Sequence, residues 1–237
     1  MIKTTYHVGY FEFDNLEDAE IFDKYLEVFS KEQLDVIYSG YQSKIDYTIY
    51  AKPEFNEDQM EQIRSGLESK LDVRFYANAE FNFHQMRQII YGLIEGLDVS
   101  IYSKPEFDWV QMKMLRLGLE KSLDVTVYAN PELNYLQMEQ IREGLTKNLD
   151  VTWYAKPEFD YEQMIQIRLG LEGNLDVSIY SKDEFNTAQM KQIRIGLKQN
   201  LDVSIYAKSI FEASQMKEIR LALSNNIEMD LNSFINN

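Results

Sequence analysis

The sequence has no cysteine and only two histidines, His7 and His84, among 237 residues. Without thiols the chain cannot form disulfides or thiolate metal sites. With so few imidazoles, the commonest general bases and metal ligands are scarce. No run of 18 apolar residues occurs, so we expect no membrane-spanning helix. The segment Met1 to His7 lacks the apolar core of a secretory signal, and we therefore expect a cytoplasmic protein.

Basic residues are also in the minority, because 24 Lys and Arg stand against 39 Asp and Glu, for a formal net charge of −15. This balance disfavours direct binding to a phosphate backbone. It favours solubility, a basic partner or mimicry of a nucleic acid, of which a solvated acidic surface is the simplest explanation. Apolar residues make up 45% of the chain, which is enough to predict a folded core and not a disordered chain.

One segment recurs along most of the chain with a period of 26 residues, and its clearest copy runs from Leu149 to Asn174. Such a fixed period is typical of a solenoid, in which each unit contacts mainly its neighbours. We number the positions of each repeat from 1 to 26. The copies follow one another without insertion or deletion and begin at Ile45, Leu71, Leu97, Leu123, Leu149, Leu175 and Leu201. The sequence thus predicts a mainly α, right-handed α/α solenoid of seven repeats.

A capping box predicts a helix in the second half of each repeat. Position 12 is Asn or Asp in six copies and position 15 is Gln in all seven, as in Asp160 and Gln163. The helix should run from position 13 to about 25, with Met at 16, Ile or Leu at 19 and Leu at 23 facing the core. A recurrent Gly at position 22 predicts that a neighbouring backbone passes close by. Position 26, often Asn, suits a left-handed cap.

Positions 1 to 8 allow two interpretations. Asp150, at position 2, can cap a short helix from Val151 to Ala155. The segment Val151 to Tyr154 also has strong strand propensity, which would give a β/α solenoid of the leucine-rich-repeat kind. We favour the helix, because a small Ala or Ser always follows the tyrosine and Pro comes two residues later in four copies.

The two ends of the chain depart from the repeat. In residues 1–44 we predict a strand over Thr4 to Phe13 and a helix over Leu16 to Phe29 that Asn15 caps. Two further strands are predicted over 34–38 and 45–50. At the other end, Leu231 and Phe234 are predicted to close the core. The predicted domains are an N-terminal α/β cap (1–44), the solenoid (45–226) and a C-terminal cap (227–237).

The repeats resemble a family of tandem repeats found in many uncharacterised proteins of gut Firmicutes and their mobile elements. Its motifs are Gln-Met-x-x-Ile-Arg-x-Gly-Leu and Leu-Asp-Val-x-x-Tyr-Ala, seen here in Gln163-Met164, Ile167-Arg168, Gly170-Leu171 and Leu175-Asp176-Val177. Residues 45–226 carry the resemblance and residues 1–44 lie outside it. The resemblance implies a repeat module in a phage or mobile-element setting and brings no activity.

Catalytic chemistry finds little support in the sequence. Recurrent residues are explained first by folding, and no glycine-rich phosphate loop, nucleophile elbow or His-Glu-x-x-His motif is present. His7 and His84 are each isolated, and a hydrolase built around His7 is the last-ranked alternative. We expect no enzyme, no catalytic residue, no metal and no cofactor.

Three charged positions recur with the period. Asp at position 2 could bind cations as a ladder, but capping is the simpler role. Glu at position 10 and Arg at position 20, each present in six copies, are predicted to form ion pairs within or between repeats. A reader of single-stranded RNA would also carry one Arg per repeat. The net charge opposes that interpretation.

The residues that vary between copies carry the functional prediction. Positions 13, 17, 21 and 24 share one face of the long helix, opposite the constant stripe. Exposed Trp, Tyr and Arg are typical of binding hot spots. The alternative is that these residues fill space against the next repeat. The predicted partner-binding residues are Phe83, Arg87, Tyr91, Trp109, Lys113, Leu117, Tyr135, Tyr161, Ile165 and Leu169.

The sequence therefore predicts a non-enzymatic scaffold that binds a protein through this variable aromatic and apolar face, with no direct binding to nucleic acid or membrane. The alternative is an acidic phage or mobile-element inhibitor, of the anti-CRISPR or anti-restriction type, that occupies a basic nucleic-acid-binding groove of a host-defence protein. The net charge and the resemblance suggest it. The sequence does not indicate an oligomeric state.

Overall fold

A computed structural model describes residues 5–228 of the chain. Two short strands and a helix come first, followed by long α-helices that alternate with short 3-10 helices. The first elements are β1 (Tyr6–Val8), β2 (Phe11–Phe13) and α1 (Leu16–Tyr25). The long helices are α2 (Lys31–Gln42), α3 (Glu57–Glu68), α4 (Phe83–Ile94), α5 (Trp109–Leu119), α6 (Tyr135–Thr146), α7 (Tyr161–Glu172), α8 (Thr187–Lys198) and α9 (Ala213–Ser224). The 3-10 helices are η1 (Tyr47–Ile49), η2 (Val73–Phe75), η3 (Val99–Ile101), η4 (Val125–Val127), η5 (Val151–Trp153), η6 (Val177–Ile179) and η7 (Val203–Ile205).

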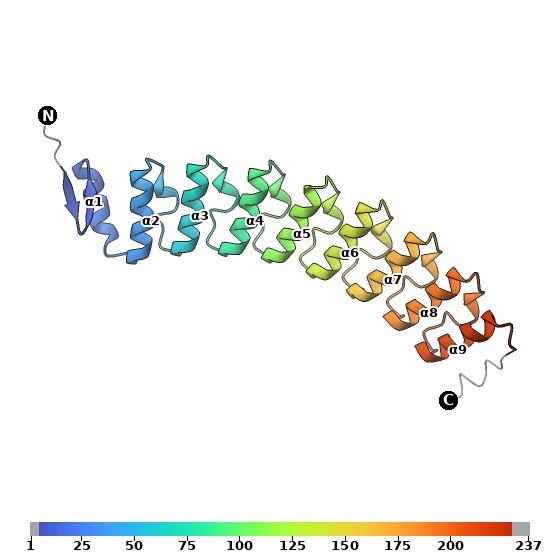
Figure 1. Cartoon of the computed structure of the whole chain (residues 1–237). Helices are drawn as coiled ribbons and strands as arrows, with labels where there is room; N and C mark the ends of the chain where they lie inside the picture. Colours follow the sequence, from blue (N-terminus) through green and yellow to red (C-terminus); the bar gives the residue numbers. More distant parts are fainter. Residues whose placement is uncertain (1–4, 229–237) are drawn as a thin grey trace. The chain divides into compact units, whose positions relative to one another are not determined.

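The long helices pack in tandem. The chain divides into two compact units, Met1–Arg116 and Leu117–Asn237. In unit 1, α2 packs against α3 and α3 against α4, and in unit 2 the helices α6 to α9 pack successively in the same way. Figure 1 shows the long helices of each unit side by side in chain order. This arrangement is an α solenoid of repeats with a small N-terminal β hairpin, which confirms the mainly α prediction.

The start of each repeat is a 3-10 helix, so the leucine-rich-repeat alternative is wrong. In the copy that begins at Leu149, Asp150 Oδ1 accepts hydrogen bonds from the Thr152 N–H at 3.2 Å and the Thr152 hydroxyl at 2.5 Å. The Tyr154 N–H then donates to the Val151 carbonyl at 3.0 Å, which closes the turn. The aspartate cap and the burial of Val151 and Tyr154 outweigh the strand propensity of the segment.

The predicted capping boxes are present, and the glutamine in them has a second role. Gln59 Oε1 accepts from the Asn56 N–H at 2.9 Å, and Asn56 Oδ1 accepts from the Gln59 N–H at 2.9 Å. The Nε2 of the same side chain donates to the Phe81 carbonyl of the following repeat at 2.6 Å. Gln163 repeats the arrangement in unit 2, donating to the Phe185 carbonyl at 2.8 Å. One buried amide therefore starts its own helix and joins it to the next repeat.

The glycine at position 22 faces a tyrosine side chain, so the prediction of a neighbouring backbone is wrong. A Cβ built on Gly144 would lie 1.9 Å from Tyr154 Oη. That tyrosine is fully buried, and its hydroxyl donates to the Gln140 carbonyl at 3.2 Å. The same pair of glycine and tyrosine recurs in the other repeats except the last, which has Ala222 at this position. We call it the glycine–tyrosine joint.

The core contains more than the predicted stripe. Met at position 16 and Ile or Leu at position 19 are fully buried, as in Met86 and Ile89, whereas Leu at position 23 is only half-buried. Val at position 3, Tyr at position 6 and the aromatic or Leu at position 11 complete the core. Position 26 takes the predicted left-handed conformation in every copy, for example at Asn174 with φ +52°.

The N-terminal segment differs from the prediction in two ways. The single predicted strand is a hairpin, because Gly9 with φ +57° reverses the chain and Val8 pairs with Phe11. The two strands predicted over 34–38 and 45–50 are wrong, since these residues form α2 and η1. Ser30 caps α2, with its Oγ accepting from the Gln33 N–H at 3.2 Å.

The segment around α2 has the joints of a further repeat. Gln33 Nε2 donates to the Phe55 carbonyl at 2.7 Å, and a Cβ on Gly40 would lie 1.8 Å from Tyr50 Oη. The predicted helix after Asn15 is present but ends at Tyr25. Leu231 and Phe234 lie outside the described residues. Within residues 5–228, no helix has the length and apolar character needed to cross a membrane.

Candidate functional site

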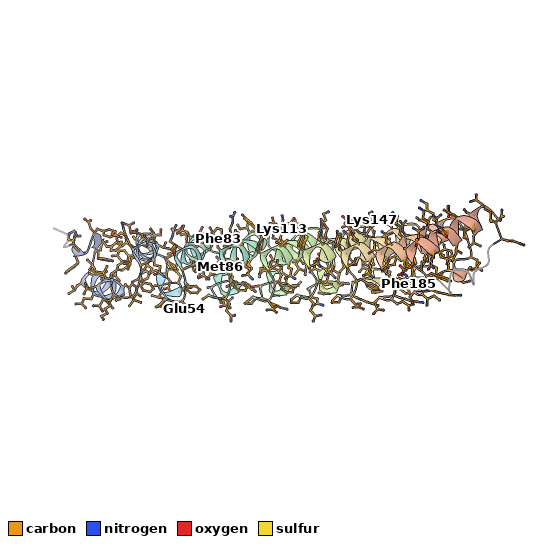
Figure 2. All side chains as sticks on the ribbon, turned by 90° about the horizontal axis from the view of Figure 1, so that it is seen from below. Glu54, Phe83, Met86, Lys113, Lys147 and Phe185 are labelled. Atoms are coloured by element: carbon orange, nitrogen blue, oxygen red, sulfur yellow. The ribbon has the colours of Figure 1, made fainter. Side chains whose placement is uncertain are left out.

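All ten predicted binding residues lie on the long helices, and none of them is buried. Arg87, Trp109 and Tyr135 are exposed, and the other seven are half-buried. Phe83, Arg87, Tyr91, Trp109 and Lys113 belong to unit 1, and the rest to unit 2. Within unit 1, Phe83 and Lys113 lie along one edge and Glu54, from the short-helix side of its repeat, lies at the opposite edge (Figure 2).

In unit 1 the structure brings aromatic and cationic side chains of α4 and α5 together. Phe83, Arg87 and Tyr91 are spaced by four residues, so they stack along one face of α4. The Arg87 guanidinium lies 5.4 Å from the ring centres of both Phe83 and Tyr91 and donates to Tyr91 Oη. The His84 ring lies 5.4 Å from that of Phe83 and 5.6 Å from that of Trp109. We call these five residues the aromatic cluster.

Local structure fixes the position of the cluster. Asn82 caps α4, and Asp108 Oδ1 accepts from the Val110 and Gln111 N–H groups at 2.7 and 2.8 Å, so Phe83 and Trp109 are each the first residue of their helix. Gln85 Nε2 donates to the Phe107 carbonyl at 2.6 Å and joins α4 to the segment before α5. These bonds align the two helix starts, which places His84 against Trp109.

The charge of α4 and α5 differs from that of the whole chain. Neither helix contains an Asp or a Glu, although the chain has a net charge of −15. Arg116 pairs with Glu95 at 3.5 Å and lies 5.5 Å from the centre of the Tyr91 ring. Among residues 5–228, Arg87 and Lys113 form no ion pair with a carboxylate. Within their bounds these two helices therefore carry positive charge and no carboxylate, in a chain that is acidic overall.

The predicted residues of unit 2 are more dispersed. Tyr135 is 47% exposed at the start of α6, while Tyr161, Ile165 and Leu169 line one face of α7 and are half-buried. No ring contact joins Tyr135 to Tyr161 within the described part of the chain. Leu117 is half-buried on α5. These side chains offer apolar area but do not form a cluster like that of unit 1.

Three residues near or beyond the predicted face were missed. His84 belongs to the aromatic cluster, Arg116 contacts it through Tyr91, and Trp153 is 38% exposed on η5. His84 follows Phe83 directly, so helical spacing from the start of α4 could have placed it at the edge of the face. Trp153 lies on a 3-10 helix, where the spacing of the long helix gives no prediction.

The recurrent charges serve the fold. Each Asp at position 2 accepts from a backbone N–H two residues further on, as Asp98 does from Ser100 at 3.1 Å, which confirms the capping role. Arg168 pairs with Glu143 of the preceding helix at 3.0 Å and with Glu172 of its own helix. The Lys147 ammonium, which donates to Glu172 at 2.8 Å, is the main cause that lowers the pKa of the Glu172 carboxyl. Arg64 and Arg142 likewise pair with acids of their own helices, whereas Arg194 and Arg220 donate to Gln166 and Gln192 of the preceding helix. Within residues 5–228, none of these ion pairs involves a glutamate at position 10.

The hairpin and α2 border a cleft of about 480 Å³ whose wall includes Tyr38 and Tyr41. Both hydroxyls bond to the backbone of β2 and the residue after it, since Tyr38 Oη donates to the Glu12 carbonyl at 2.8 Å and Tyr41 Oη accepts from the Asp14 N–H at 3.2 Å. His7 lies outside this wall, exposed, with Nδ1 3.9 Å from Glu12 Oε1. Within residues 5–228 no three His, Asp or Glu side chains lie close enough to hold a metal ion.

Comparisons with known proteins give no relative. No family model matches the chain, and no curated protein or solved structure matches it either.

Proposed function

We propose that this chain is a non-enzymatic scaffold of the cytoplasm that binds a protein partner through the variable face of its long helices, centred on the aromatic cluster. The observation that carries the proposal is the exposure of Trp109, which is 41% accessible beside a half-buried Phe83 and an exposed Arg87. Apolar and aromatic side chains left open to water in this way stabilise a complex when a partner covers them.

The constant and the variable residues of the repeats have different roles, which supports the proposal. Caps, core positions and joints use the residues that recur, so these residues are needed for folding in every repeat. The variable residues on the same helices are free of that requirement. Trp, Tyr and Arg dominate binding hot spots because they combine large contact area with hydrogen-bonding groups.

The two tryptophans of the chain permit a matched test. Trp109→Ala and Tyr161→Ala together should leave the helical circular dichroism unchanged and abolish recovery of the partner in a pull-down from the native host. Trp109→Ala alone should weaken binding by about 2 kcal/mol or more, as at other hot spots. The control is Trp153→Ala, which removes a similarly exposed indole from the short-helix side. Equal recovery of the partner with both single variants would refute the proposal.

The net charge of −15 favours a second candidate, an acidic inhibitor that occupies a basic groove of a nucleic-acid-binding host protein. Here the acidic residues would make the contacts, and the α3 helix alone carries Glu57, Asp58, Glu61 and Glu68. A charge mimic with many ionic contacts loses affinity steeply as salt rises, whereas a face that binds mainly through aromatic and apolar contacts loses much less. Measuring partner affinity at low and high salt separates the two functions.

A further inference from the structure

The charge of the aromatic cluster carries a more specific inference about the partner, and this inference rests on the proposed function. The α4 and α5 helices contain Arg87, Lys113 and Arg116 but no carboxylate, in a chain with a net charge of −15. By contrast, Arg64 on α3 pairs with Glu61 at 2.5 Å and Glu68 at 2.6 Å. Arg116 pairs with Glu95, but Arg87 and Lys113 form no ion pair within residues 5–228, and these two cations near an exposed tryptophan suggest which charge a partner brings.

Contacts with neighbouring aromatic rings preorganise the Arg87 side chain for binding an anion. Its guanidinium lies 5.4 Å from two ring centres, Phe83 and Tyr91, and uses one nitrogen to donate to Tyr91 Oη. A guanidinium has five N–H donors, so several remain for a ligand. Holding the side chain between rings reduces the rotamer entropy that binding would cost, and the planar group matches the two oxygens of a carboxylate.

The side chains near Arg87 favour a ligand that has an apolar residue next to its anionic group. Trp109, on the following helix, is 41% exposed and its ring lies 5.6 Å from that of His84. Lys113 lies one helical turn after Trp109 and forms no ion pair within residues 5–228. An indole covers an aliphatic or aromatic side chain, while the Arg87 guanidinium and the Lys113 ammonium, both one turn further along their helices, bind carboxylates.

We propose that the partner presents to this cluster a short acidic segment, which combines Asp or Glu residues with an aliphatic or aromatic residue. A nucleic acid also combines negative charge with stacking groups. The long phosphate backbone would nevertheless be repelled by the rest of a chain that carries 39 acidic residues. A peptide segment with a few carboxylates is attracted by the positive charge of α4 and α5. Because it is short, the acidic residues elsewhere in the chain repel it only weakly.

The test uses a random 12-residue peptide library selected on the full chain carrying Trp153→Phe, so that Trp109 is the only remaining tryptophan. Peptides recovered in the selection are synthesised and titrated by Trp109 fluorescence. Acidic peptides with an aliphatic or aromatic residue should be enriched. Arg87→Glu combined with Lys113→Glu should weaken their binding at least tenfold, and Arg87→Gln with Lys113→Gln should weaken it less.

The matched control is Lys191→Glu combined with Lys217→Glu. These lysines occupy the same repeat position, 17, on α8 and α9 and are exposed, so the control changes the net charge equally without touching the cluster. It should leave peptide affinity within about twofold. An equal loss in the control would show a general charge effect and would overturn the inference.

Other outcomes are equally clear. Enrichment of neutral or basic peptides that still quench Trp109 would overturn the acidic segment and leave the proposed binding face intact. Tighter binding of a 12-nucleotide oligothymidine would point to a nucleic acid and overturn it too. A dimer in sedimentation velocity that Arg87→Glu with Lys113→Glu dissolves would identify a second copy as the occupant. If the Trp109 fluorescence responds to none of the probes, the inference and the proposed binding face both fail.

Discussion

The glycine–tyrosine joint makes the sharpest prediction about stability, and Gly66→Ala is the variant that tests it. A Cβ at residue 66 would lie 1.6 Å from Tyr76 Oη, 3.0 Å from its Cζ and 3.2 Å from Val73 Cγ1. The tyrosine is fully buried and its hydroxyl donates to the Gln62 carbonyl at 3.4 Å. The ring must therefore shift, and the hydroxyl loses that bond.

Three effects determine the size of the change. Alanine in a helix interior is favoured over glycine by about 1 kcal/mol. Against this, overpacking a core costs roughly 1–3 kcal/mol, and a buried hydroxyl without its bond costs about 1–3 kcal/mol. We expect Gly66→Ala to lower the free energy of unfolding by about 1–5 kcal/mol, although helix propensity alone would raise it.

Urea unfolding followed by circular dichroism measures the change, and a double-mutant cycle assigns its cause. Tyr76→Phe removes the clashing oxygen and leaves contacts of 3.0 and 3.2 Å. Gly66→Ala should therefore cost at least about 1 kcal/mol less in the Phe background than in the wild type. The control is Gly173→Ala, where the nearest atoms would be 3.5 Å away and no loss is expected. A stabilising Gly66→Ala, or a coupling energy near zero, would refute the reasoning.

Three further predictions concern the repeats. Gln163→Ala removes both the capping acceptor and the donor to the Phe185 carbonyl, and should cost about 2–4 kcal/mol in urea unfolding; a loss under about 0.5 kcal/mol would contradict its dual role. Burial raises the pKa of Tyr206 to about 12, above the unfolded value of about 10, so this residue should stabilise the fold fully below pH 10 and lose that contribution as pH rises toward 12. The free energy of unfolding in urea should therefore fall more between pH 10 and pH 12 in the wild type than in Tyr206→Phe, and an equal fall in both would argue against it. Gly96→Ala should cost about 1–2 kcal/mol of backbone strain, because φ is +69° and the added Cβ would touch nothing, and an unchanged urea midpoint would show that the strain is absent.

Local signals in the sequence were enough to predict the helices of the repeats. Capping boxes, the apolar stripe and the left-handed cap each depend on residues within one helix, so their spacing defines them without knowledge of the neighbours. The partner of Gly144 was not predictable in this way, because Tyr154 approaches it only after the chain has turned back. A recurrent glycine indicates that another group packs closely against its Cα, but it does not identify that group.

The α2 helix, the first with repeat-like joints, was missed because its residues depart from the repeat pattern. Leu34-Asp35-Val36 imitates the start of a repeat and suggested a strand, while Ser30 and Leu34 replace the usual Asx and Met of the helix. Two signals could have found α2, the Ser30 to Gln33 capping box and Gly40 at position 22. For the candidate site, spacing predicted residues that the structure places on the long helices and leaves exposed or half-buried. It could not predict that His84 would meet Trp109, since that contact depends on how two helices align.

The second hydrogen bond of the capping glutamine has a consequence for how such a chain can change. Gln59 and Gln163 join their helices to the next repeat through backbone carbonyls, which every amino acid provides. The tyrosine of the glycine–tyrosine joint also bonds to a backbone carbonyl. A 26-residue cassette could therefore be duplicated, deleted or exchanged with new junctions chemically the same as the old ones. Recombination could then change the proposed binding face one cassette at a time while the framework stays intact.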